Sequence, residues 1–169
     1  SSQNISSLNL ENADVISIAQ EASKTCIQVF FYRSKQNWGN QSFFPSHDDS
    51  YSVEEILKSF IVQFYENKNV PSEILLNKKI NGLKLIKIAL EKKENKTISI
   101  KTPTKGNTLK LSKMAEKNAK EALTRKIFES ETNIKLLDQI AEKFELSILP
   151  RNVEVYDNSH ISGTNSVGA

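Results

Sequence analysis

The chain has 169 residues, of which 38% are hydrophobic and 25% charged, and its net charge is +3. This length and composition suit one domain with a buried core, or a domain with an appendage, and exclude a chain that is disordered throughout. Cys26 is the single cysteine, which excludes an internal disulfide and a cysteine-based metal site, and no apolar run approaches the ~20 residues of a membrane span.

The start of the chain is polar. Residues 1–12 are rich in Ser and Asn, so we expect a disordered lead-in there. Residues 1–4 lack the basic and apolar regions of a signal peptide. Together with the lone cysteine, these features favour a protein of the reducing cytoplasm that has no membrane partner.

Three strands are predicted next. Residues 13–20 alternate apolar and polar side chains, residues 25–33 are β-branched and aromatic, and residues 41–45 form a return strand that Pro45 closes. The sequence Asn37-Trp38-Gly39-Asn40 predicts the turn between the second and third strands. We therefore expect an antiparallel meander of three strands.

Two short features beside these strands allow a functional and a structural interpretation. Trp38 could stack on a nucleic-acid base, but an aromatic residue that folds over its own hairpin is the commoner case. His47, Asp48 and Asp49 could ligate a metal. Because three adjacent side chains do not easily converge on one ion, we expect both acids to act as favourable charges near a helix N-terminus instead.

Helices and strands alternate after this point. Ser52 and Glu55 have the spacing of a capping box, and the apolar residues of 53–64 fall on one helical face. Glu54 and Glu55 are therefore expected to serve the start of that helix. Further elements are predicted at residues 73–76 (strand), 83–93 (helix) and 97–101 (strand).

A long helical segment follows over residues 109–146. Its apolar residues form one stripe, but a single straight helix of this length would span about 57 Å at 1.5 Å per residue. That length exceeds the diameter of a compact unit of this size. We therefore predict a break or bend near residues 130–133, where helix propensity is lowest.

The predicted order of elements, β-β-β-α-β-α-β-α, indicates an α/β fold. Three antiparallel strands followed by two crossover strands give a mixed five-stranded sheet with helices on its faces, the element order of the RNase H fold. Residues 13–146 would form this unit. Residues 147–169 would follow as a linker and one further strand.

That last strand ends in a carboxylate. Residues 153–156 alternate apolar and polar side chains, and Asp157 follows where the strand runs out. A carboxylate at the end of a buried strand is costly unless something compensates it, and Mg²⁺ is a common compensation. The alternative is ordinary turn chemistry, because Asp157 and Asn158 can also bond nearby backbone groups.

The sequence of residues 151–163 resembles the opening strand of the C-terminal nuclease domain of the UvrC family, the incision subunits of the UvrABC excinuclease. It reads R-N-V-E-V-Y-D-N-S-H-I-S-G. Residues 33–45, R-S-K-Q-N-W-G-N-Q-S-F-F-P, are similar to that family's middle region. The resemblance implies two RNase H-like units in tandem, with the second one cut off at Ala169. The chain would then be a middle slice of a longer protein.

The resemblance also implies a function. The longer protein would incise damaged DNA on both sides of a lesion in nucleotide excision repair, with DNA and the UvrB subunit as partners. Asp157 would be a catalytic ligand of Mg²⁺ or Mn²⁺, while Ser159 and His160 would shape its turn. The other members of the metal site would lie downstream, so no cofactor and no cutting are expected of this chain alone.

The first unit is predicted to be non-hydrolytic. Phosphodiester hydrolysis in this fold needs carboxylates at neighbouring strand ends to hold Mg²⁺. Ser17 and Ala19 stand where the first strand would need an Asp, Asp14 lies too early, and Asn77 ends the fourth strand. We expect a degenerate unit that docks the nuclease domain or guides DNA.

Lysines are concentrated in the middle of the chain. Residues 78–120 contain thirteen Lys and three Glu, a local balance of +10. A basic face of this kind attracts phosphate backbones, and Lys84, Lys87, Lys92 and Lys93 are the candidate DNA contacts. The alternatives are a solvated lysine surface, a stand-alone basic nucleic-acid-binding module or a protein-docking module. We expect a monomer or a weak dimer.

Overall fold

The computed structural model describes residues 10–144 and contains one five-stranded sheet and three helices. In chain order the elements are β1 (Asn12–Glu21), β2 (Lys24–Arg33), β3 (Gln36–Phe43), α1 (Val53–Phe64), β4 (Glu73–Leu76), α2 (Leu83–Glu94), β5 (Ser99–Lys101) and α3 (Gly106–Lys143). The strand order is β3-β2-β1-β4-β5. β1 and β2 pair antiparallel, as do β2 and β3, whereas β4 runs parallel to both β1 and β5. The predicted mixed sheet is confirmed.

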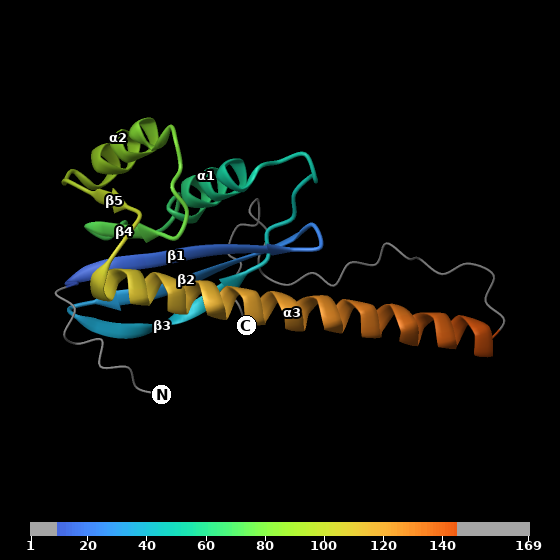
Figure 1. Cartoon of the computed structure of the whole chain (residues 1–169). Coiled ribbons are helices and arrows are strands. Elements are labelled where there is room, and N and C mark those ends of the chain that lie inside the picture. Colours follow the sequence, from blue (N-terminus) through green and yellow to red (C-terminus); the bar gives the residue numbers. More distant parts are fainter. Residues whose placement is uncertain (1–9, 145–169) are drawn as a thin grey trace.

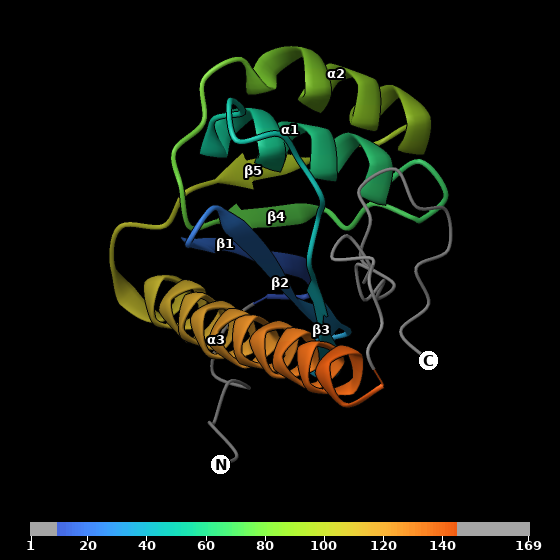
Figure 2. The ribbon, with the colours of Figure 1, turned by 90° about the vertical axis from the view of Figure 1, so that its right-hand side faces the viewer.

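Helices cover both faces of the sheet, so the molecule has three layers (Figure 1, Figure 2). α1 and α2 lie on one face and α3 lies on the other. The larger core cluster joins α1 to the sheet, and its aromatic centre contains Phe43, Phe60 and Phe64 in mutual ring contact. Two smaller clusters join α3 to β1, β2 and β4. β1 is therefore buried on both of its faces.

The first helix begins where the sequence predicts it. The Ser52 side chain accepts a hydrogen bond from the backbone N–H of Glu55, and the Glu55 carboxylate accepts one from the N–H of Ser52. This reciprocal pair is a capping box, which satisfies N–H groups that have no partner within the helix. The predicted role of Glu55 at the helix start is confirmed. Asp48, by contrast, caps a turn before the helix, since its carboxylate accepts from the N–H of Ser50 at 2.9 Å.

The turn predicted at residues 37–40 is wrong. The chain reverses at Ser34 and Lys35, whose φ angles are 52° and 64°, and β3 begins at Gln36. The pairing shifts between Phe31 and Tyr32, so that Trp38 is an extra, unpaired residue in β3. Gly39, with φ of 112°, therefore marks a β-bulge instead of a turn.

The bulge decides the environment of Trp38. Its side chain is 70% exposed, so it does not fold over its own hairpin. The N–H of Gly39 donates to the side-chain oxygen of Asn37 at 2.7 Å, which fixes the bulged backbone locally. The structural interpretation of Trp38 is thus wrong, and the base-stacking interpretation stays a prediction.

The break predicted near residues 130–133 is also wrong. α3 is one helix of 38 residues from Gly106 to Lys143. Between Gly106 and Pro150 the sequence has no other glycine or proline. The weak helix formers at 130–133 cost only a few tenths of a kcal/mol each, so extending the helix is easier than ending it and nucleating another.

The bounds of the ordered body also differ slightly from the prediction. Leu10 is buried in the cluster beneath α3 and β1 begins at Asn12, so both residues, which we placed in the lead-in, belong to the folded body. Residues 1–9 and 145–169 lie outside the described part of the chain. Among residues 10–144, no helix combines the length and the apolar character needed to cross a membrane.

Asp14 is a buried carboxylate in the middle of this body. Arg33 donates to one of its oxygens at 2.8 Å, and the hydroxyl of Tyr65 donates to the other at 2.5 Å. Burial raises the pKa of Asp14, while the bonds from Arg33 and Tyr65 act to lower it. Burial also raises the pKa of Tyr65 well above its usual value, so the phenol remains a donor. The network ties β1 and β2 to the end of α1.

We predict that Tyr65→Phe destabilises the chain by about 1–3 kcal/mol, because a buried carboxylate loses a donor. Loss of that bond raises the pKa of Asp14 further above its unfolded value. A raised folded pKa means that stability is lost as pH rises through it, so the deficit should be larger at pH 7 than at pH 4. Urea unfolding at both pH values measures it.

Tyr32→Phe is the matched control. Tyr32 is 1% exposed, its hydroxyl has no hydrogen-bond partner among the described residues, and burial raises its pKa to about 12. Removing that hydroxyl should leave the stability unchanged or slightly increased. Equal losses in the two variants would show that the bond to Asp14 contributes nothing.

Candidate functional site

The candidate site lies where β4 ends beside the middle of β1. The last pair of these parallel strands is Ile16 with Leu76, so the next residues, Ser17 and Asn77, are neighbours. Adjacent ends of parallel strands commonly carry the functional groups of α/β proteins. Here they are the position at which an RNase H-like hydrolase would need its metal-binding carboxylates.

Asn77 continues the sheet with its side chain. Its oxygen accepts a hydrogen bond from the N–H of Ile18 at 2.9 Å, and its amide nitrogen donates to the carbonyl of Ile18 at 3.0 Å. Its backbone N–H donates to the carbonyl of Ile16 at 3.3 Å. β1 runs past the end of β4, so the Asn77 amide occupies backbone groups that would otherwise be unpaired inside the protein.

Ser17 and Ala19, which stand where β1 would need an Asp, serve packing against α3. Ser17 is completely buried, and its hydroxyl donates to the carbonyl of Ser112 in α3 at 2.9 Å. Ala19 packs against Ala119 and Leu123 of the same helix. Both residues therefore hold α3 close to the sheet, and a carboxylate at either position would have to enter a filled contact.

One carboxylate does reach the site, and it comes from α3. Glu116 accepts a hydrogen bond from the side-chain amide of Asn77 at 2.6 Å, and its other oxygen lies 3.8 Å from the ammonium of Lys120. We did not single out Glu116 from the sequence. Its one signal was its place beside Ala115 in the apolar stripe of the long helix, which puts its side chain at the margin of the buried face.

This donor set does not suit Mg²⁺. The ion takes oxygen ligands, from one or two carboxylates together with water and substrate phosphate. Asn77 instead turns its NH₂ group toward Glu116 and its oxygen toward a backbone N–H. Within residues 10–144, no group of three or more His, Cys, Asp and Glu side chains could hold a metal ion. The arrangement is a hydrogen-bonded clamp between β1, β4 and α3.

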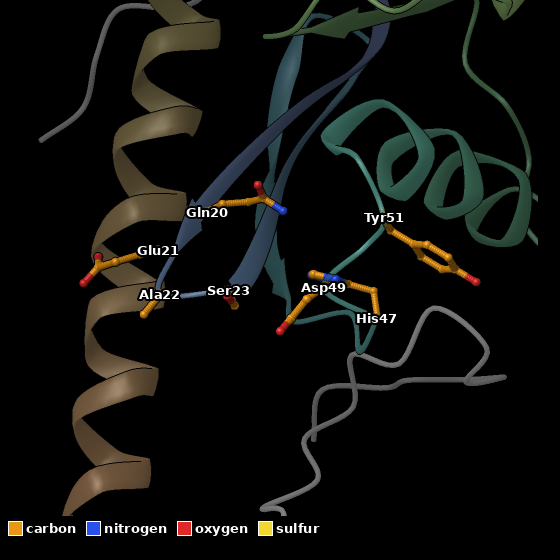
Figure 3. Close-up of a pocket in the computed structure, with 7 residues that line it drawn as sticks. All are labelled: Gln20, Glu21, Ala22, Ser23, His47, Asp49 and Tyr51. Carbon is orange, nitrogen blue, oxygen red and sulfur yellow. The ribbon is translucent and has the colours of Figure 1, made fainter.

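A second candidate is an open hollow of about 250 Å³ between the β1–β2 turn and the loop before α1 (Figure 3). It is lined by polar side chains, including Gln20, Glu21, His47, Asp49 and Tyr51. Both ring nitrogens of His47 have contacts. Nε2 lies 2.6 Å from the Thr25 hydroxyl, and Nδ1 lies 3.0 Å from the carbonyl of Asp48.

One tautomer of the ring satisfies both contacts. Nδ1–H then donates to the carbonyl and Nε2 accepts from the Thr25 hydroxyl, which in turn accepts from Gln20 at 3.1 Å. Both nitrogens of His47 are occupied, so neither is available to a ligand. The hollow is therefore a junction that joins the loop to the sheet.

The four candidate lysines all lie on α2 or at its end, but they do not form one patch. At about 100° per residue, Lys84, Lys87 and Lys92 share one broad face, whereas Lys93 is about half a turn from Lys84. Lys93 donates to the carbonyl of Lys68 at 2.6 Å. Two apolar side chains, Leu85 and Ile88, are 78% and 50% exposed on the outer face of the helix.

The residue expected to bind metal in the second unit cannot be placed. Asp157 lies outside residues 10–144, as do Ser159 and His160, so their predicted roles stay predictions. The structure brings together Ser17 and Asn77, which stand where we expected an active unit to need carboxylates, and adds Glu116 to them. It places Asp14 in a separate network with Arg33 and Tyr65.

We predict that Asn77→Asp destabilises the chain by about 2–4 kcal/mol at neutral pH. The change removes the donors to Ile18 and Glu116 and sets two carboxylates side by side. Protonation restores a donor, so the loss should shrink as pH falls toward 4. Adding Glu116→Gln should recover part of the loss in a double-mutant cycle measured by urea unfolding.

The exposed Asn67 supplies the control, because Asn67→Asp makes the same chemical change and should leave stability within about 0.5 kcal/mol. An Asn77→Asp variant as stable as the wild type at pH 7, or one that Mg²⁺ restores to full stability, would contradict our description of the clamp.

Comparison with known proteins identifies the fold. A family model described as the UvrC ribonuclease H-like domain matches residues 12–126. The chain is 48% identical over 169 residues to the UvrABC system protein C of Bartonella quintana (strain Toulouse), which covers 100% of this chain and 25% of that protein. It is 44% identical over 167 residues to the UvrABC system protein C of Maricaulis maris (strain MCS10), which covers 99% of this chain and 26% of the relative.

The chain therefore spans about a quarter of the length of the curated relatives it matches. The matched range contains every strand of the sheet, from the start of β1 at Asn12 to the end of β5 at Lys101. Because the family model accounts for well over half of the residues, this chain belongs to the UvrC family and has the fold of its ribonuclease H-like domain.

Proposed function

We propose that this chain belongs to an incision subunit that cuts damaged DNA on both sides of a lesion in nucleotide excision repair. Its relatives carry the name UvrABC system protein C, and the proposal extends to this chain the DNA substrate, the UvrB partner and the cytoplasmic setting. The unit over residues 13–146 would be a scaffold that docks the nuclease domain or guides DNA.

The observation that supports a non-hydrolytic role is the clamp at the end of β4. Asn77 and Ser17 stand where a hydrolase would place carboxylates, and each makes hydrogen bonds that the fold itself needs. Glu116 is held by an amide N–H, 2.6 Å away. A single carboxylate in this setting gives a phosphodiester neither a metal nor an activated water.

The catalytic metal would instead belong to the unit that begins in residues 147–169. We propose Asp157 as its first ligand in this chain, for Mg²⁺ or Mn²⁺, which would polarise a phosphoryl oxygen and lower the pKa of a bound water. One carboxylate cannot complete such a site. Incision by the longer subunit would therefore need Asp157 together with ligands from residues beyond this chain.

The purified 169-residue chain should not nick damaged duplex DNA above background in Mg²⁺ or Mn²⁺, as measured by gel electrophoresis of end-labelled DNA. In the longer subunit, Asp157→Ala should abolish one of the two incisions, while Glu116→Ala should preserve both. Robust nicking by the isolated chain that disappears on Asp157→Ala would overturn the proposal, and so would nicking that depends on Glu116.

A second candidate function is nucleic-acid binding through α2. It is favoured by the shared outer face of Lys84, Lys87 and Lys92, which the described residues leave open to solvent or only half-buried. Phosphate contacts release counterions, so affinity that depends on these lysines must fall with salt.

We predict that reversing Lys84, Lys87 and Lys92 to Glu weakens DNA binding at least tenfold at low salt and reduces the slope of log K against log salt by about 2–3. Fluorescence anisotropy with a labelled duplex measures both quantities. Reversing Lys24, Lys35 and Lys135 gives the same change of net charge away from α2. Equal effects from the two triple variants would show that only net charge matters, and that α2 is no dedicated site.

A further inference from the structure

The second half of α3 extends beyond the sheet that the first half covers. The buried residues of α3 are Leu111, Ser112, Ala115, Ala119, Ala122 and Leu123. From Thr124 to Phe144 no residue is buried among those that the structure describes. Figure 1 shows the helix projecting past the β1–β2 turn. The family match ends at residue 126, close to the same point.

The apolar face of α3 does not end there. Five side chains form what we call the distal stripe: Ile134, Leu137, Ile140, Ala141 and Phe144. At about 100° per residue, they lie on the same side of the helix as Ala115, Ala119 and Leu123, which pack on the sheet. Within the described residues Ile134 is 44% exposed and Phe144 is 64% exposed. The opposite side carries mainly polar residues such as Thr132, Lys135 and Gln139.

A stripe of this kind needs a partner. Most of the stability of a protein helix comes from packing an amphipathic face, since propensity alone barely holds an isolated helix of this length. Burying side chains such as Ile134 and Phe144 removes apolar surface from water, which is favourable. Because most residues opposite the stripe are polar, the distal part of α3 is amphipathic, as is the part that packs on the sheet.

We propose that residues 145–169 of the same chain cover the distal stripe. This segment follows directly after Phe144, the last residue of the distal stripe. Its 25 residues could reach about 80 Å when extended, whereas the helix from Ile127 to Phe144 is about 27 Å long. Its sequence supplies apolar residues for the contact: Leu146, Ile148, Leu149, Val153 and Val155.

A second copy of the chain is a weaker occupant. A strip about 27 Å long and about 10 Å wide offers roughly 300 Å² of face, against the ~800 Å² per partner of a standard stable interface. A segment that is covalently attached at the end of the stripe has a high effective concentration there, so it binds the stripe in preference to a second copy of the chain. This proposal does not depend on the proposed function. If residues 145–169 cover the distal stripe, Asp157 lies beside α3.

Hydrogen–deuterium exchange on the complete 169-residue chain tests the proposal. Amides of residues 146–156 should exchange at least tenfold more slowly than an unstructured peptide of the same sequence. Ile134→Asp with Leu137→Asp should remove that protection. Phe128→Asp with Thr132→Asp introduces the same charges on the opposite face, where Phe128 is 69% exposed, and should preserve the protection. The chain should sediment as a monomer.

A second variant tests the contact from the other side and leaves α3 unaltered. Val153→Asp with Val155→Asp should speed exchange at residues 134–144 while circular dichroism shows the body still folded. The proposal fails if residues 146–156 exchange at the unstructured rate in the wild type. It also fails if both Asp pairs on α3 act alike, or if the chain forms a dimer that the Ile134 and Leu137 changes dissociate.

Discussion

The burial of β1 on both faces is the constraint on which the rest of the structure depends. Seven consecutive residues, 13–19, are buried, so every polar group on them needs a partner inside the protein. Asp14 is satisfied by Arg33 and Tyr65, and Ser17 by a carbonyl of α3. Each of these bonds joins β1 to a different element. The polar groups of one strand thereby fix the positions of α1 and α3.

The same constraint acts on the residue that follows β4, Asn77. Beyond the end of β4, the backbone of Ile18 must be paired, and Asn77 provides both a donor and an acceptor for it. An ionised carboxylate has only acceptors, so at this position it could not serve both groups, and its charge would need a metal or another cation. The choice of amide or carboxylate at one residue thus decides between a clamp and a metal ligand.

The sequence predicts the sheet and the first helix well, because both depend on local signals. Alternation identifies β1, and the Ser52–Glu55 spacing identifies the helix start. The prediction fails at the second hairpin, whose Ser34-Lys35 turn lacks the Gly or Asn that usually marks positive φ, while Gly39 nearby serves a bulge. Glu116 escaped notice because its role depends on a partner 39 residues away, and no local pattern reports such contacts.

Because α3 is unbroken, it links the part of the helix that packs on the sheet to the part that extends beyond the sheet. A helix with a kink near residue 130 would let whatever follows swing relative to the sheet, whereas 38 residues in one rod keep a fixed direction from Gly106 to Lys143. The sheet holds the first half of that rod through Ala115, Ala119 and Leu123. An element packed on the second half of α3 would therefore have a fixed orientation relative to β1, because β1 holds the first half of the helix. Such a role would require only that the sheet and α3 form a rigid body.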